Sequence, residues 1–93
     1  MSVSVRIPTI LRPYTGGASE VTIEPGEDTL AGVLTALELA APGIAARVLD
    51  DAGTLRRFVN IYVDDEDVRF TDGLATPVKP GAHVSIIPAV AGG

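Results

Sequence analysis

The last two residues of the chain, Gly92 and Gly93, are the residues best suited to chemistry. With glycine at about 7% of average usage, two glycines at the final positions occur by chance in roughly one chain in 200. A glycine pair lets the backbone approach a catalytic centre closely and leaves the terminal carboxylate open to activation. Val90 and Ala91 precede the pair. We therefore expect residues 89–93 to form a flexible tail that threads into the narrow active site of a partner.

The other residues that could carry chemistry fit structural or solvated roles better. The acidic run 64–67 lacks the spacing of a calcium loop, so it is interpreted as a solvated turn. His83 is the only histidine and has no nucleophile motif beside it. Residues 16–17 lack the Lys and Ser or Thr of a phosphate-binding loop. Because the chain has no cysteine, disulfides, thiolate metal sites and cysteine nucleophiles are excluded, and we expect no bound metal.

The composition of the 93 residues predicts one folded domain, residues 1–93. Seven Lys and Arg against 12 Asp and Glu give a net charge of -5, which disfavours nucleic acids and anionic lipids as partners. The longest nearly apolar stretch, residues 30–41, is shorter than the roughly 18 residues of a membrane span. The first residues show no export signal, so we expect a cytoplasmic protein.

Apolar periodicity in the first half of the chain predicts two strands and a helix. Residues 3–7 and 20–24 alternate polar and apolar side chains, which is typical of half-buried strands that pair as a hairpin. Residues 30–41 place apolar side chains at helical spacing, with Asp28 or Thr29 as the N-cap. This helix must cover one face of the sheet that positions the tail.

The second half predicts the rest of the sheet. Residues 58–70 are predicted to be a hairpin in which 68–70 form the returning strand. Residues 44–50 are expected to add one or two helical turns, and 82–88 to form the last strand, leading into the tail. The predicted fold class is α+β, with one main helix packed on a mixed sheet.

Register also predicts a partner surface away from the helix. Phe58, Tyr62 and Ile87 occupy outward positions of their strands, where large apolar side chains are suited to contact another protein. The alternative is that they are scattered exposed apolar residues, which most proteins have. Arg56 and Arg57, just before the strand of Phe58, are interpreted as a solvated pair, with a polar rim of this surface as the alternative.

The order of these elements and three stretches of sequence resemble the ThiS/MoaD family of ubiquitin-like sulfur carriers. The stretches are IPTILRPYTGG (7–17), RFVNIYVDDEDVRF (57–70) and GLATPVKPGAHVSIIPAVAGG (73–93), and they look most like the cysteine-biosynthetic carriers of actinobacteria. The resemblance covers the whole chain and implies a β-grasp fold. It also implies that an E1-like enzyme uses ATP to adenylate Gly93, which is then converted to a thiocarboxylate.

The resemblance further implies that the chain is a protein cosubstrate, not an enzyme, and that catalysis lies in its partners. Those partners would be an E1-like adenylyltransferase and sulfurtransferase, a PLP-dependent cysteine synthase or another thiolating enzyme, and a zinc metalloprotease that frees cysteine from Gly93. Family members use the outward position of Ile87 as an apolar contact with the activating enzyme, and Phe58 and Tyr62 extend this expected surface.

Two alternatives stay open at this stage. The chain could be the small subunit of molybdopterin synthase, although those subunits commonly have two prolines where Pro88 and Ala89 stand here. It could instead be a β-grasp interaction module whose terminal glycines are incidental. Modification of other proteins also stays open, while the single Lys79 leaves little scope for chains linked through this protein.

Overall fold

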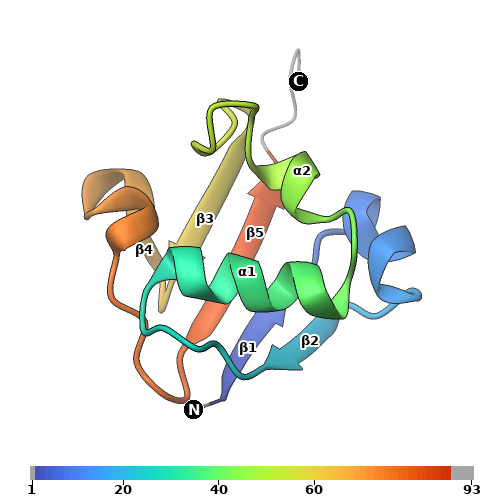
Figure 1. Cartoon of the computed structure of the whole chain (residues 1–93), viewed down its shortest axis with the longest axis horizontal. Coiled ribbons are helices and arrows are strands. Elements are labelled where there is room, and N and C mark those ends of the chain that lie inside the picture. Colours follow the sequence, from blue (N-terminus) through green and yellow to red (C-terminus); the bar gives the residue numbers. More distant parts are fainter. Residues whose placement is uncertain (1, 89–93) are drawn as a thin grey trace.

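A five-stranded mixed sheet is the framework of the computed structural model, which describes residues 2–88. The strand order is β2-β1-β5-β3-β4, and β1 and β5 pair in parallel although they come from opposite ends of the chain (Figure 1). The other neighbouring strands are antiparallel. The strands are β1 (Val3–Arg6), β2 (Glu20–Ile23), β3 (Val59–Val63), β4 (Glu66–Asp67) and β5 (His83–Pro88).

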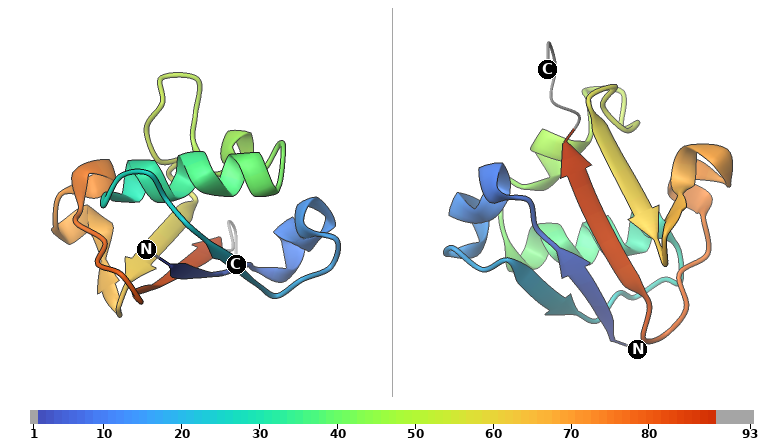
Figure 2. Two further views of the ribbon diagram at one scale, coloured as in Figure 1. Left: turned by 60° about the horizontal axis from the view of Figure 1, so that its bottom comes forward. Right: turned by 180° about the vertical axis from the view of Figure 1, so that it is seen from behind.

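The main helix, α1 (Leu30–Ala40), lies across one face of this sheet (Figures 1 and 2). Thr29 is its N-cap, because the Thr29 hydroxyl accepts a hydrogen bond from the backbone N–H of Gly32 at 3.2 Å. The predicted helix is confirmed, and Asp28 is not the cap. Its apolar side chains are buried against the inward side chains of the strands; they are Leu30, Val33, Leu34 and Leu37 from the helix and Val3, Val5, Ile61, Val84 and Ile86 from the sheet.

The opposite face of the sheet is uncovered in the described part of the chain, as the view from behind shows (Figure 2, right). The alternation of buried and more exposed residues along β3 and β5 confirms the predicted inward and outward positions. None of the helices within residues 2–88 has the length and apolar character needed to cross a membrane.

The link after α1 turns sharply into a short helix, α2 (Ala45–Val48), with Ile44 and Val48 fully buried. The Glu38 carboxylate accepts hydrogen bonds from the backbone N–H groups of Gly43, at 2.8 Å, and Ala45, at 2.9 Å. These donors, Gly43 first, lower the pKa of the Glu38 carboxyl below its ordinary value because they stabilise its charged form. Glu38 therefore fixes the start of α2 relative to the end of α1.

The predicted returning strand over residues 68–70 is wrong. The strand β4 contains only Glu66 and Asp67, and Val68–Phe70 form a 3₁₀ turn, η2. The side chain of Asp67 accepts a hydrogen bond from the backbone N–H of Arg69 at 2.9 Å, which caps a helical turn instead of continuing the strand. Val68 is then fully buried, while Phe70 is 88% exposed.

Two further 3₁₀ segments were not predicted. They are η1 (Thr9–Thr15), which follows β1 directly, and η3 (Gly73–Ala75), which follows η2. In η1 the side chain of Leu11 is buried. Prolines at positions 8 and 13 end the strand as expected, but they also suit a short helical turn that brings η1 beside α2 (Figure 1).

Candidate functional site

The predicted tail begins at one end of the sheet. The strand β5 ends at Pro88, whose Cα partner across the ladder is Val59 of β3. The tail, 89–93, lies outside the described residues, and with it every predicted reactive or threading residue: Val90, Ala91, Gly92 and Gly93. The described structure therefore defines the base of the tail and its surroundings.

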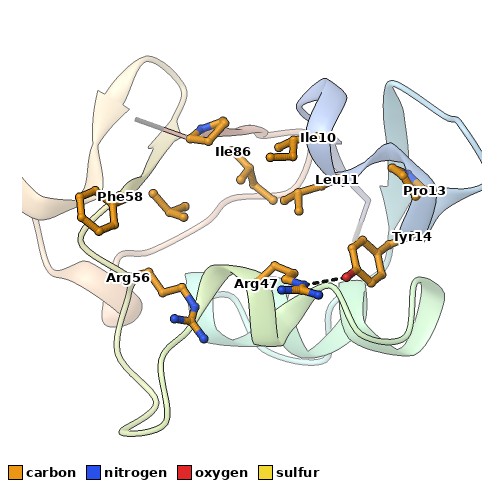
Figure 3. Close-up of a pocket in the computed structure, with 10 residues that line it drawn as sticks. Ile10, Leu11, Pro13, Tyr14, Arg47, Arg56, Phe58 and Ile86 are labelled. Atoms are coloured by element: carbon orange, nitrogen blue, oxygen red, sulfur yellow. Dashed lines mark hydrogen bonds between the residues drawn. The ribbon is translucent and has the colours of Figure 1, made fainter. Parts of the chain in front are cut away.

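A cavity of about 540 Å³ lies at this base, between η1, α2 and the ends of β3 and β5 (Figure 3). Its walls are mainly apolar because they are formed where the interior of the domain opens at the end of the sheet. The apolar lining includes Ile10 and Leu11 from η1, Phe58 and Val59 at the start of β3, and Ile86 and Pro88 from β5.

Two arginines form the polar part of the cavity wall. Arg47 donates a hydrogen bond from Nε to the Tyr14 hydroxyl at 2.7 Å, and its guanidinium carbon lies 5.8 Å from the centroid of the Tyr14 ring (Figure 3). Arg56 donates from Nε and Nη2 to the carbonyl oxygen of Ala46, at 3.1 and 3.0 Å. Among residues 2–88, no Asp or Glu lines the cavity. The cavity is therefore locally positive on a chain whose net charge is -5.

The three predicted partner-surface residues divide between two places. Ile87, 46% exposed, lies on the uncovered face of the sheet, opposite Asn60 in the ladder, and Tyr62 shares this face and is half-buried. Phe58, 57% exposed, precedes β3 and lines the cavity (Figure 3). The sheet face and the cavity thus both lie close to the base of the tail.

His83 and the acidic turn have structural contacts. Asp64 and His83 are joined by two hydrogen bonds of 2.9 Å, from the Asp64 N–H to the His83 carbonyl and from the His83 N–H to the Asp64 carboxylate. Asp64 and Asp65 both have positive φ, as a two-residue hairpin turn requires. Within residues 2–88, no group of three or more His, Cys, Asp or Glu side chains is placed to hold a metal ion.

The sequence did not reveal the cavity. Tyr14 and Arg47 are 33 positions apart, and Arg56 was interpreted as part of a solvated pair. No spacing pattern links these residues, because they meet only when η1 folds as a 3₁₀ segment and packs beside α2. The one usable signal was the proline pair around Ile10 and Leu11, which marks a turn followed by apolar residues without a strand.

Comparison with known proteins finds one matching family model and relatives that match this chain over its full length. The model of the ThiS family matches residues 5–93. The sulfur carrier protein CysO of Mycobacterium tuberculosis is 55% identical over 100% of both chains. The small archaeal modifier protein 3 of Haloferax volcanii is 32% identical, also over 100% of both chains.

Among solved structures, a chain of the BexX/CysO complex of Amycolatopsis orientalis superposes with a TM-score of 0.88. That chain is 47% identical, and the match covers 98% of the present chain and 99% of the other. The similarity therefore extends over the sheet, the helix and the end of the sheet from which the tail departs.

Proposed function

The chain belongs to the ThiS family and is a sulfur carrier protein with a β-grasp fold, and from this premise we propose that Gly93 is the site that carries the sulfur. The observation that supports this most directly is the 55% identity, over the full length of both chains, to a protein named as a sulfur carrier. In this proposal the Gly93 carboxylate is adenylated and then converted to a thiocarboxylate for use in cysteine biosynthesis.

The chemistry explains why glycine must be last. A carboxylate is a poor electrophile, so it must first attack the α-phosphorus of ATP and release pyrophosphate, which gives an acyl adenylate. Sulfide-level sulfur then attacks the acyl carbon and displaces AMP, leaving an anionic thiocarboxylate that can act as a nucleophile. Gly92 and Gly93 present no side chain that would obstruct either attack. Because activation consumes ATP, we place it in the cytoplasm.

Catalytic groups for these steps come from partner enzymes. In the described part of the chain, no His, Cys, Asp or Glu that could act as a base or nucleophile lines the cavity at the base of the tail. We propose an E1-like adenylyltransferase and sulfurtransferase for activation. A PLP-dependent cysteine synthase then accepts the sulfur, and a zinc metalloprotease frees cysteine from Gly93. A similar carrier forms a complex with BexX, which supports docking of this fold on a partner protein and keeps another sulfur acceptor open.

The absence of cysteine makes a direct test available. The chain is incubated with an E1-like enzyme, ATP and sulfide, treated with iodoacetamide, and its C-terminal fragment is analysed by mass spectrometry. We expect a carbamidomethyl group on Gly93, since no thiol elsewhere in the chain can take it. Reactions without ATP, or with a chain that lacks Gly93, are the controls. A folded chain with an intact terminus that is never alkylated would contradict the proposal.

A second candidate function is attachment to lysine side chains of other proteins. The 32% identity to small archaeal modifier protein 3 favours it. Both functions need the same acyl adenylate at Gly93, and they differ in whether sulfide or a lysine amine attacks it. The same reaction without sulfide, supplemented with a cell extract, separates them: an isopeptide between Gly93 and lysine in tryptic digests supports conjugation, and its absence leaves sulfur transfer alone.

A further inference from the structure

The cavity at the end of the sheet and the start of the tail are parts of one feature. Pro88 is the last described residue and is itself a wall of the cavity. The five residues that follow it are Ala, Val, Ala, Gly and Gly, and they end in a carboxylate. An apolar segment with a terminal anion therefore begins at the rim of an apolar cavity that contains two cations.

We propose that this cavity is the resting site of the chain's own residues 89–93. In the docked state Val90 packs against the apolar wall near Phe58, and the Gly93 carboxylate lies beside the guanidinium groups of Arg47 and Arg56.

The segment is long enough to reach both arginines. Five extended residues span at most about 17 Å, and a sphere with the cavity volume of about 540 Å³ is about 10 Å across. Because the segment starts on the cavity wall, it needs only to turn back across the opening. The two glycines allow the tight backbone conformations of such a turn.

The charges of the cavity match a terminal anion. The Tyr14 hydroxyl engages only Nε of Arg47, so both Nη groups of Arg47 remain available within the described structure. Arg56 uses Nε and Nη2 on the Ala46 carbonyl, which leaves Nη1. Since no Asp or Glu side chain of residues 2–88 lines the cavity, none of them competes with the terminal anion for the two arginines.

Docking of this kind is weak and reversible. Both arginines are exposed, and exposed ion pairs are screened by salt. The covalent link supplies a high effective concentration, which compensates for the few contacts. The biological role of docking rests on the proposed function: the same site would shield a thiocarboxylate at Gly93 until a partner displaces it.

Nuclear magnetic resonance of the unmodified full chain tests the inference directly. The protein has only two Phe and two Tyr residues, so ring protons of Phe58 and Tyr14 can be assigned singly. We expect nuclear Overhauser contacts from the Val90 methyl groups to the ring protons of Phe58 or Tyr14. A folded chain whose Val90 methyl groups show no contact with either ring would overturn the inference.

Charge variants test the role of the anion. We expect the double variant Arg47→Gln and Arg56→Gln to lower the equilibrium constant between the docked and undocked states of residues 89–93 about two- to fivefold. This is the range of an exposed ion pair. The matched control, Arg6→Gln with Arg57→Gln, removes the same charge from exposed positions outside the cavity and should leave docking unchanged. Equal effects of the two double variants would overturn the ion pair.

A chain made with a Gly93 carboxamide removes the anion without changing any folded residue, so it keeps the test decisive even where an arginine variant fails to fold. It should weaken docking as the Arg47 and Arg56 variant does; undiminished docking would contradict the ion pair. None of these measurements uses ATP, sulfide or an enzyme. Failure of docking therefore leaves the assignment of Gly93 as the sulfur site intact, and failure of activation leaves docking intact.

Discussion

Arg47 and Tyr14 are joined by a hydrogen bond of 2.7 Å from Nε to the phenol oxygen, across 33 positions of the sequence. The bond connects α2 to η1, the two short elements that face each other across the cavity at the end of β5 (Figure 3). The separation of these elements, and with it the shape of the cavity beside Pro88, depends on this contact together with the buried Leu11 and Val48.

The change Tyr14→Phe removes this bond and keeps the ring. We expect it to lower the free energy of unfolding by about 1 kcal/mol or less, since the bond is exposed and water can replace the lost partner. Urea unfolding followed by circular dichroism measures the change. The matched control is Tyr62→Phe, on the uncovered sheet face and outside the cavity. If Tyr62→Phe costs as much as Tyr14→Phe, the bond to Arg47 contributes no specific stability.

The Glu38 carboxylate predicts a pH dependence of stability. Its pKa in the folded chain is lowered by the N–H groups of Gly43 and Ala45, so the folded state binds its proton less tightly than the unfolded chain does. Stability from Glu38 is therefore complete above the unfolded value of about 4.3 and is lost as the pH falls through the lower folded value. Urea unfolding of the natural chain between pH 7 and pH 3 should show this loss.

Replacing the carboxylate identifies its share of the pH dependence. Glu38→Gln should be less stable than the natural chain at pH 7 and should lose less stability as the pH falls, because the amide oxygen carries no charge. Glu24→Gln, at an exposed position of the loop after β2, serves as the control for removing one negative charge. Identical pH profiles for Glu38→Gln and the natural chain would exclude the backbone contacts as the cause.

Local sequence patterns predicted those elements whose side chains alternate or repeat around one buried face. The strand with Val3 and Val5 and the helix with Leu30 and Leu37 were predicted because the core selects apolar residues at a fixed period. The strand predicted over residues 68–70 is wrong because a buried Val68 beside a half-buried Asp67 resembles the alternation of a strand. The Asp67 side chain instead caps a turn. The difference is a hydrogen bond that periodicity does not encode.

Of the proposed site, the sequence predicts only the terminal glycines, which lie outside the described residues. Gly92 and Gly93 are recognised by type and position alone, because the chemistry needs a terminus without side chains. The cavity at the end of β5 combines residues from η1, α2 and β3 that become neighbours through tertiary packing, so Arg47 carries no local signal. Arg56 looked like a solvated residue for the same reason, since its contact with Ala46 spans ten positions, from the loop before β3 to α2.

Ile87 is predicted to contact the activating enzyme through the uncovered face of the sheet. Its side chain is 46% exposed, so Ile87→Ala should change the free energy of unfolding by only about 0.5 kcal/mol or less. Truncation of a side chain that anchors an interface costs more than 1 kcal/mol of binding free energy. We therefore expect kcat/KM for adenylation of the chain to fall about tenfold. The rate of ATP-dependent pyrophosphate release measures it.

The control for Ile87→Ala is Phe70→Ala, because Phe70 is 88% exposed but belongs to η2, away from the uncovered face near the tail. Phe70→Ala should leave kcat/KM unchanged. A variant at Ile87 that is adenylated as efficiently as the natural chain would remove this residue from the partner surface and leave Phe58, at the cavity, as the apolar contact to test next.

One alanine added after Gly93 tests whether the terminal glycines are functional or incidental. The addition converts the Gly93 carboxylate to an amide, which cannot attack ATP, and it moves the new carboxylate about 3.5 Å further out beside a methyl group. We expect the extended chain to fold with unchanged stability and to lose sulfur loading, measured by alkylation and mass spectrometry. One residue added before Met1 is the control and should be loaded normally. If the C-terminally extended chain is loaded at the natural rate, the terminal position of Gly93 does not direct the chemistry.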